Sequence, residues 1–207
     1  MLILVRHGQS EANLAGLLVG RIDSPLTRLG LEQAGLVGEA LSSSIDAPYS
    51  IITSPLQRAV MTAEAIAGAF EKRSVMGDVE VDERFLELDY GELDGCAPRD
   101  LPAGLFDHWR SDAGWRPPGG ETLEELGARV ATACEQFASQ ASNGNVIIVS
   151  HVSPIKAAIV WAIQGRLEMS WRLSLNVASI TRIITGGSGG AALLSFNETA
   201  HLGGAVA

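Results

Sequence analysis

The sequence predicts an α/β protein, a three-layer α/β/α sandwich around a mostly parallel central sheet with one antiparallel strand. Short apolar runs with the length of buried strands alternate with segments whose apolar residues recur at helical spacing. Strands that alternate with helices favour a parallel sheet covered on both faces. Near the end of the chain, two strand-like segments are joined through a glycine-rich stretch, which indicates a hairpin and therefore one antiparallel strand.

The expected elements follow in order along the chain. Thr27 is a suitable N-cap for the first helix, and Ser54 with Pro55 predicts an N-cap and a first helical residue for the second. The glycine-rich connection of the hairpin is Gly186-Gly187-Ser188-Gly189-Gly190. The expected strands are 2–6, 49–54, 79–81, 145–150, 177–184 and 191–196, and the expected helices are 27–41, 55–70, 122–139 and 153–163.

One stretch does not fit this alternation. Residues 88–120 are rich in glycine, proline and tryptophan and predict a long excursion from the sheet. Its aromatic side chains either line a pocket or pack as a cap, and the packed cap is the preferred interpretation; they are Phe106, His108, Trp109 and Trp115. Because no internal repeat or linker interrupts the chain, we expect one domain over residues 1–207.

The composition narrows the class of protein. The chain has 207 residues, 46% of them hydrophobic, and a net charge of −9, which fits one domain with an ample core. The acidic balance and the lack of a basic run argue against nucleic acid and anionic membranes as partners. Cys96 and Cys134 form no disulfide or metal pattern, and no signal peptide or membrane span is visible, so we expect a soluble cytoplasmic protein.

Reactive side chains stand where the predicted strands end. The first strand ends in Arg6-His7-Gly8, the second is followed by Arg58 one helical turn on, and a later strand ends in Ser150-His151. The carboxyl ends of neighbouring parallel strands meet at one crevice, which would hold these histidines and arginines. The arginine fork matches phosphate or carboxylate oxygens, and the free N–H groups at the start of helix 55–70 would favour an anion in the same place. The residues predict an oxyanion pocket with a histidine inside it.

A neutral histidine in such a pocket is a competent nucleophile toward phosphorus. A metal site is the competing interpretation, but none of the 4 histidines are spaced as a ligand pair and the arginines repel a divalent cation. No nucleotide-binding P-loop and no Gly-x-Ser-x-Gly elbow is present. Neither Cys96 nor Cys134 is followed six residues later by arginine, so a cysteine-based phosphatase loop is absent.

Displacement of an alcohol from phosphate also requires an acid that protonates the leaving oxygen. Glu87 lies between Leu86 and Leu88, where partial burial would favour its protonated form. Glu87 is therefore the preferred candidate. Three further carboxylates nearby are expected to be more solvated; they are Asp89, Glu92 and Asp94.

Motifs spread over almost the whole chain resemble the histidine phosphatase superfamily, in the branch that contains cofactor-dependent phosphoglycerate mutases and their phosphatase relatives. The 87–95 and 119–122 segments are also similar to small α-ribazole-phosphate phosphatases. The motifs are Arg6-His7-Gly8 with Asn13, residues 20–27 leading into Gly30 and Gln33-Ala34, residues 54–59 with Thr62-Ala63, Glu87 with Tyr90-Gly91 and Gly95, residues 118–122, and Ser150-His151.

This resemblance implies a role for each matching residue. His7 would be the nucleophile that becomes phosphorylated, and Glu87 would be the general acid and then the base that activates water. The phosphoryl group would be bound by Arg6, Arg58 and His151, with a further contact from Asn13. Other substrate contacts are implied for Arg21, Glu121 and Tyr90.

The chain also departs from the family pattern. The family often has His-Gly-Gly where this chain has His151-Val152-Ser153, and Val152 would change access to the site. The chain lacks room for most of the segments that cap the site of glycolytic mutases. A phosphatase without metal or cofactor, acting on a small phosphorylated metabolite, is therefore favoured. The alternatives are a mutase that needs a bisphosphate primer and a non-catalytic phosphate-binding module, and a homodimer through exposed sheet edges stays open.

Overall fold

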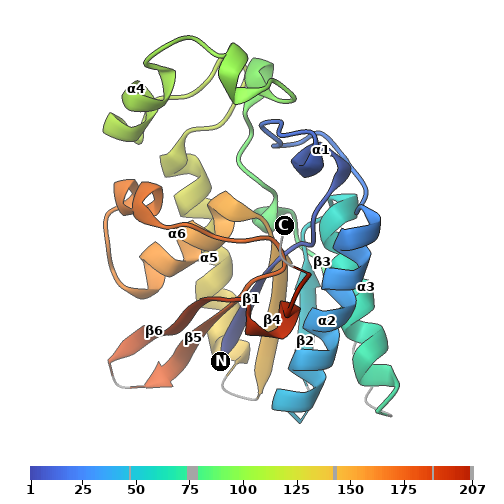
Figure 1. Cartoon of the computed structure of the whole chain (residues 1–207). Helices are drawn as coiled ribbons and strands as arrows, with labels where there is room; N and C mark the ends of the chain where they lie inside the picture. Colours follow the sequence, from blue (N-terminus) through green and yellow to red (C-terminus); the bar gives the residue numbers. More distant parts are fainter. Residues whose placement is uncertain (47, 74–78, 142–143, 188, 206–207) are drawn as a thin grey trace.

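The computed structural model describes residues 1–46, 48–73, 79–141, 144–187 and 189–205. Its centre is one sheet with the strand order β3-β2-β4-β1-β5-β6 (Figure 1). β1 pairs in parallel with β4, β4 with β2 and β2 with β3, whereas β5 runs antiparallel to both β1 and β6. The predicted fold class is confirmed. The strands are β1 Leu2–Arg6, β2 Pro48–Thr53, β3 Val79–Val81, β4 Asn145–Ser150, β5 Ile180–Gly187 and β6 Gly190–Glu198.

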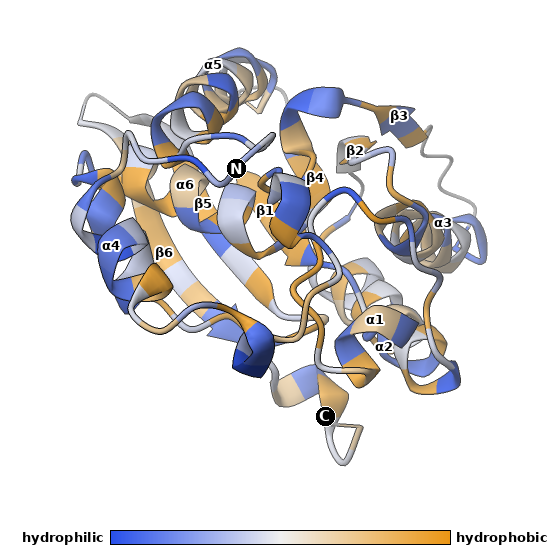
Figure 2. Cartoon of the chain, turned by 90° about the horizontal axis from the view of Figure 1, so that it is seen from above, coloured by the Kyte–Doolittle hydropathy of each residue, from blue (hydrophilic) through white to orange (hydrophobic). Residues whose placement is uncertain are grey.

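Helices cover both faces of the sheet (Figure 2). Successive side chains of a strand point to opposite faces, and β1 divides its apolar residues accordingly. Leu2 and Leu4 belong to the core formed with α5 and α6, whereas Ile3 and Val5 belong to the core formed with α2 and α3. The helices are α1 Glu11–Leu14, α2 Arg28–Ser44, α3 Gln57–Glu71, α4 Leu105–Ser111, α5 Leu123–Gln140 and α6 Val152–Ala162.

The start of α3 differs from the prediction. Ser54 is not its N-cap and Pro55 is not its first residue, because the helix begins at Gln57 after an extended Leu56. The Ser54 hydroxyl instead contacts Nε2 of His151 at 2.8 Å and accepts from Leu56 N at 3.4 Å. The first N–H of α3 donates to the Asp23 carboxylate at 2.7 Å, so the free donors expected there are partly satisfied by the protein itself.

The other boundaries lie close to the predicted ones. Two short helices were not predicted: α1, capped by Ser10, and α4, which lies inside the excursion. β5 begins at Ile180 rather than at residue 177, because Ala178 adopts a left-handed backbone conformation that ends extended structure. In the hairpin connection, Ser188 lies outside the described residues.

The excursion over residues 88–120 lies above the carboxyl ends of the parallel strands (Figure 1). Trp109 is fully buried at its centre, with ring contacts to Tyr90, Phe106 and Trp115. This segment is a packed cap, as preferred from the sequence. Among the described residues, no helix combines the length and apolarity needed to cross a bilayer. One domain over residues 1–207 stays a prediction.

Candidate active site

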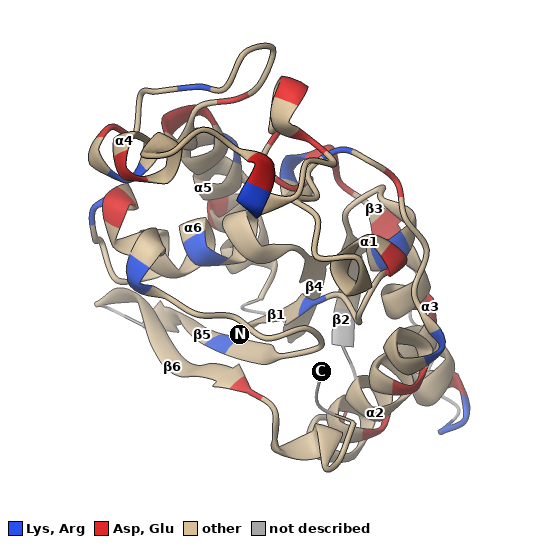
Figure 3. Cartoon of the chain, turned by 45° about the horizontal axis from the view of Figure 1, so that its top comes forward, with Lys and Arg blue, Asp and Glu red and all other residues tan. Residues whose placement is uncertain are grey.

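The three strands that end in reactive residues are neighbours in the sheet. Arg6 at the end of β1 lies opposite Ser150 of β4, and Thr53 at the end of β2 lies opposite Val149 of the same strand. Their carboxyl ends therefore reach one edge, below the loops that follow them (Figure 3). The convergence predicted from the sequence is confirmed by this register.

His7 is buried and its orientation is fixed by its own loop. Its Nδ1 donates to the carbonyl of Gly8 at 2.7 Å, which assigns the tautomer and leaves Nε2 with a lone pair. Burial, and then the positive charges of Arg58 and Arg6, hold the pKa of His7 well below its ordinary value. His7 is therefore neutral, with Nε2 as a nucleophilic atom.

Arg58 is almost fully buried, and backbone carbonyls hold its guanidinium. Nη1 donates to Ile22 O and Nη2 to Gly20 O, both at 2.8 Å, while Nε donates to Nδ1 of His151 at 3.2 Å. Burial lowers the pKa of Arg58, and the nearby Glu87 opposes that shift. The fork thus has a fixed position on α3, next to the edge of the sheet.

His151 is fully buried and both of its ring nitrogens have partners. Nδ1 accepts from Arg58, so Nε2 carries the proton and donates to the Ser54 hydroxyl. Its ring centre lies 5.0 Å from that of His7. Burial and the charge of Arg58 hold the pKa of His151 well below its ordinary value, so this second histidine is neutral as well.

Arg6 presents the other cation of the site. Its Nη1 donates to Leu175 O at 2.5 Å, while its buried Nε has no hydrogen-bond partner in the described protein. Burial lowers the pKa of Arg6 to about 10, against the opposing charge of Glu87, so the side chain is still charged at neutral pH. A buried charged N–H without an acceptor costs free energy, which an anion at this position would recover.

Glu87 is 4% exposed and its carboxylate accepts backbone hydrogen bonds only. Its oxygens accept from Leu88 N at 2.7 Å and from Val152 N and Ser153 N at 3.1 Å. The last two donors are the first N–H groups of α6, so the N-terminus of this helix holds the Glu87 carboxylate, whereas that of α3 contacts Asp23. The carboxylate is thereby fixed beside Arg6 and Arg58.

A cavity of about 170 Å³ is lined by His7, both arginines and Glu87, but not by His151, so the phosphoryl contact implied for His151 stays a prediction. A second cavity, of about 260 Å³, shares Arg6 and Asn13 with it. The two cavities together have the size for a small anion with room beside it. The first cavity is lined by Arg6, His7, Asn13, Leu17, Leu18, Val19, Arg58, Glu87, Tyr90 and Val152. Arg21 and Glu121 do not line it, so the substrate contacts implied for them stay predictions.

Arg21 and Glu121 instead belong to a charge network with an arginine that the sequence analysis missed. Arg129 of α5 binds Glu121 through Nε at 2.7 Å and through Nη2 at 2.9 Å. It also donates to the carbonyls of Arg84 and Glu87, and Arg21 lies 3.7 Å from Glu121. Glu121 is close to Arg129 along the chain, but the two carbonyls come from distant residues, so no local pattern marks Arg129 as part of this network.

Asp94 is more exposed than Glu87, as expected, but its carboxylate is held by the protein. Its carboxylate accepts from the backbone N–H groups of Gly20, Arg21 and Ile22 at 2.7–2.8 Å. Gly20 and Ile22 are the residues whose carbonyls hold Arg58. Asp94 therefore anchors the loop that positions the buried arginine.

Among the described residues, no group of three or more His, Cys, Asp or Glu is arranged to hold a metal ion. A neutral histidine with a free Nε2 shares one cavity with two arginines and a buried carboxylate, and in an α/β protein this set of groups is chemically suited to phosphoryl transfer. The family model of the histidine phosphatase superfamily (branch 1) matches residues 2–199, and the chain belongs to this family.

Several curated proteins are similar to this chain. It is 31% identical over 206 residues to the Bifunctional protein Rv2228c of Mycobacterium tuberculosis. The match covers 97% of this chain but 54% of that protein, so the chain spans about half the length of this relative. It is 34% identical over 189 residues to the 2,3-bisphosphoglycerate-dependent phosphoglycerate mutase of Sinorhizobium fredii, covering 86% of the chain and 85% of the relative.

Phosphatases are also among the relatives. The glucosyl-3-phosphoglycerate phosphatase of Mycolicibacterium vanbaalenii is 31% identical over 180 residues, which cover 82% of this chain and 76% of that protein. The crystal structure of a phosphoserine phosphatase mutant from Entamoeba histolytica in complex with phosphoserine matches with a TM-score of 0.84 and 29% identity. That match covers 97% of this chain and 98% of the other.

Proposed function

We propose that this protein is a phosphomonoesterase that acts on a small phosphorylated metabolite through a phosphohistidine formed on His7. The observation that carries the proposal is the Nδ1 hydrogen bond of His7, which leaves a neutral Nε2 between Arg6 and Arg58. The phosphatases among its relatives support the same reaction class.

In the first step, the lone pair of His7 Nε2 forms an N–P bond while the ester P–O bond breaks. Glu87 gives a proton to the departing alcohol oxygen, and Arg6 and Arg58 stabilise the negative charge on the transferring phosphoryl group. Asn13 and Tyr90 line the same cavity and would contact the substrate. His151 would bind the phosphoryl group as well, if its Nε2–H exchanges the Ser54 hydroxyl for a phosphoryl oxygen.

In the second step, a water oxygen forms a bond to phosphorus while the N–P bond breaks. The water proton passes to the Glu87 carboxylate, which restores the acid, and His7 returns to its neutral form. The products are the alcohol and inorganic phosphate, and no step requires a metal or an organic cofactor.

The alternative function is mutase activity, which the phosphoglycerate mutase among the relatives favours. The two reactions share the phosphohistidine and differ in what accepts the phosphoryl group. Incubation with 3-phosphoglycerate, with and without a bisphosphate primer, separates them: a phosphatase releases free phosphate in both cases, whereas a mutase forms the isomer only with the primer.

The proposal is tested by hydrolysis of phenyl phosphate with and without a chelator. We expect turnover that the chelator does not change, an acid-labile phosphate adduct on His7, and a loss of more than about a thousandfold in His7→Ala. His108→Gln is the matched control, because His108 packs against Trp115 in the cap and does not line the cavity. Loss of activity with chelator, or an adduct on another residue, would contradict the mechanism.

A further inference from the structure

Lys156 is a cation near the site that the proposed reaction does not use. It lies on α6, one helical turn after Val152, and is half-buried. Residues four apart lie on the same face of a helix, so Lys156 continues the face on which Val152 lines the His7 cavity. Among the described residues, its ammonium has no ion pair and no hydrogen bond to a carboxylate or carbonyl.

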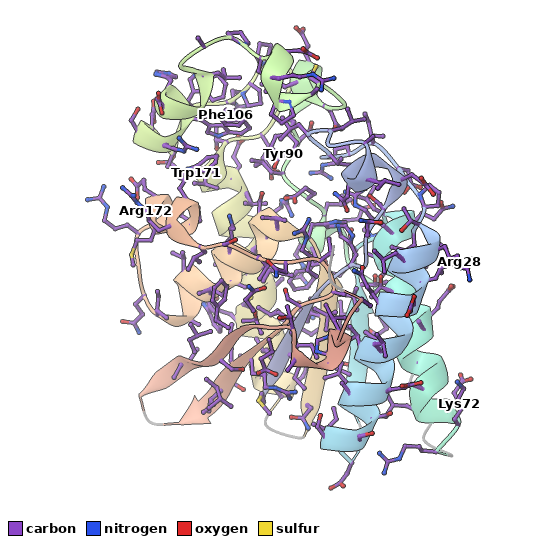
Figure 4. The ribbon with its side chains drawn as sticks, viewed as in Figure 1. Arg28, Lys72, Tyr90, Phe106, Trp171 and Arg172 are labelled. Atoms are coloured by element: carbon purple, nitrogen blue, oxygen red, sulfur yellow. The ribbon has the colours of Figure 1, made fainter. Side chains whose placement is uncertain are left out.

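The side chain of Lys156 lines a small cavity of about 80 Å³ that adjoins the His7 cavity. The two cavities share Tyr90 and Val152. Trp171 also lines the small cavity, and its buried indole N–H has no acceptor in the described protein. Figure 4 shows Tyr90 and Trp171 together below Phe106 of the cap, whereas Arg172 points away from the molecule.

Among the described residues, no carboxylate forms an ion pair with Lys156. Burial lowers the pKa of Lys156 and the charge of Glu87 opposes that shift, but the Glu87 oxygens accept their hydrogen bonds from backbone N–H groups. Glu168 lies on the neighbouring helical turn and pairs with Arg166 at 3.1 Å. Lys156 therefore brings to this cavity a cation without an acceptor in the described protein, and an anionic group that brings only acceptors would satisfy it.

We propose that this cavity is a leaving-group subsite, in which Lys156 recognises a carboxylate on the substrate close to its phosphate ester. This proposal rests on the proposed function and names its substrate class. Lys156 lies one helical turn, a rise of about 5.4 Å, beyond Val152, which lines both cavities. The class is therefore a short phosphorylated carboxylic acid, in which a few atoms separate the two anionic groups.

The subsite is tested with two pairs of esters that differ in one carboxylate: 3-phosphoglycerate against glycerol 3-phosphate, and phosphoserine against phosphoethanolamine. We expect wild-type kcat/KM to favour the acid of each pair by about tenfold or more, as one charge-assisted contact allows. Lys156→Met keeps the apolar stem and removes the charge, so this preference should disappear, and Lys156→Arg should retain part of it. Arg166→Met, an exposed cation outside the cavity, should leave the preference unchanged.

Binding to the His7→Ala variant makes the result independent of turnover. Calorimetry should show 3-phosphoglycerate bound more tightly than glycerol 3-phosphate, and His7→Ala with Lys156→Met should bind the two alike. If phenyl phosphate is hydrolysed but the carboxylic acids are not preferred, the subsite proposal is wrong and the proposed phosphatase function is unaffected. If the acids bind more tightly but no ester is hydrolysed, the proposed phosphatase function is wrong and the subsite proposal is unaffected. If Lys156→Met does not fold, Lys156→Gln serves for the same comparison.

Discussion

Asp94 holds Arg58 in place through a loop that lies between them. The carboxylate accepts three backbone N–H groups from residues 20–22, and the carbonyls of Gly20 and Ile22 in the same loop accept from the Arg58 guanidinium. The backbone N–H groups of the loop donate to the Asp94 carboxylate, and two of its carbonyls accept from the Arg58 guanidinium. An acidic side chain that does not line the cavity therefore determines where a cation that does line it lies.

We expect Asp94→Ala to lower kcat/KM by about tenfold to a hundredfold, because a loop released from its anchor misplaces the Arg58 fork. Steady-state kinetics with phenyl phosphate measure this. Asp94→Asn keeps one carbonyl oxygen and should lose less. Asp100→Ala removes an exposed carboxylate of the cap and is the matched control. Equal activity in Asp94→Ala and wild type would show that Arg58 needs no such anchor.

Glu87→Gln should slow the hydrolysis of alkyl phosphates more than that of aryl phosphates. Without an acid, an alkyl phosphate must expel an alkoxide, whereas an aryl phosphate expels a stable phenolate. We expect the rate on glycerol 3-phosphate to fall at least about tenfold more than the rate on p-nitrophenyl phosphate. The exposed Glu92→Gln is the control. In Glu87→Gln the side-chain NH2 group would lie against the N–H groups of α6, so circular dichroism must first show that the variant is folded. Equal losses of rate on both esters would contradict the assignment of Glu87 as the general acid.

The buried histidines make stability depend on pH in a known direction. Burial lowers the pKa of both His7 and His151 below the ordinary value of 6.5, so below that pH the unfolded chain binds more protons than the folded one. Stability from these groups is complete above pH 6.5 and is lost as the pH falls, by at most about 1.4 kcal/mol per pH unit for each histidine. Urea unfolding between pH 7.5 and 5.5 should show this loss.

The contribution of one histidine to this loss can be isolated. His151→Gln should reduce the pH dependence over the same range, whatever its stability at pH 7.5. His108→Gln is the control, since His108 is an exposed residue of the cap. An unchanged pH dependence in His151→Gln would mean that His151 is not held neutral by the fold.

Two glycines of α2 should respond in opposite ways to alanine. A Cβ at Gly30 would lie 2.0 Å from the carbonyl oxygen of Gln9, in the turn that follows His7, whereas a Cβ at Gly35 meets nothing within 4 Å. Gly30→Ala should therefore destabilise the protein by about 2 kcal/mol or more and lower activity. Gly35→Ala should stabilise it by about 0.5–1 kcal/mol, because it removes only the entropic cost of a helical glycine. Urea unfolding measures both, and a stable, active Gly30→Ala would contradict the close approach of α2 to that turn.

Much of the fold could be predicted because its signals are local. The apolar strands 2–6 and 145–150 and the helix capped by Thr27 carry their own periodicity and caps. The start of α3 could not be predicted in this way, because Ser54, a good N-cap by its type, contacts His151 from another strand. Where a side chain that could cap a helix makes a tertiary hydrogen bond, its local preference no longer predicts where the helix begins.

The sequence by itself determined which residues meet at the site, since Arg6, His7, Arg58 and His151 follow strands that a parallel sheet must align at one edge. Only the tertiary structure decided their chemical state. Which nitrogen of His7 is free, why both histidines are neutral, and how Asp94, Arg129 and Lys156 surround the site depend on burial and on contacts between distant residues. Desolvation and hydrogen bonding act through space, and no local sequence pattern encodes them.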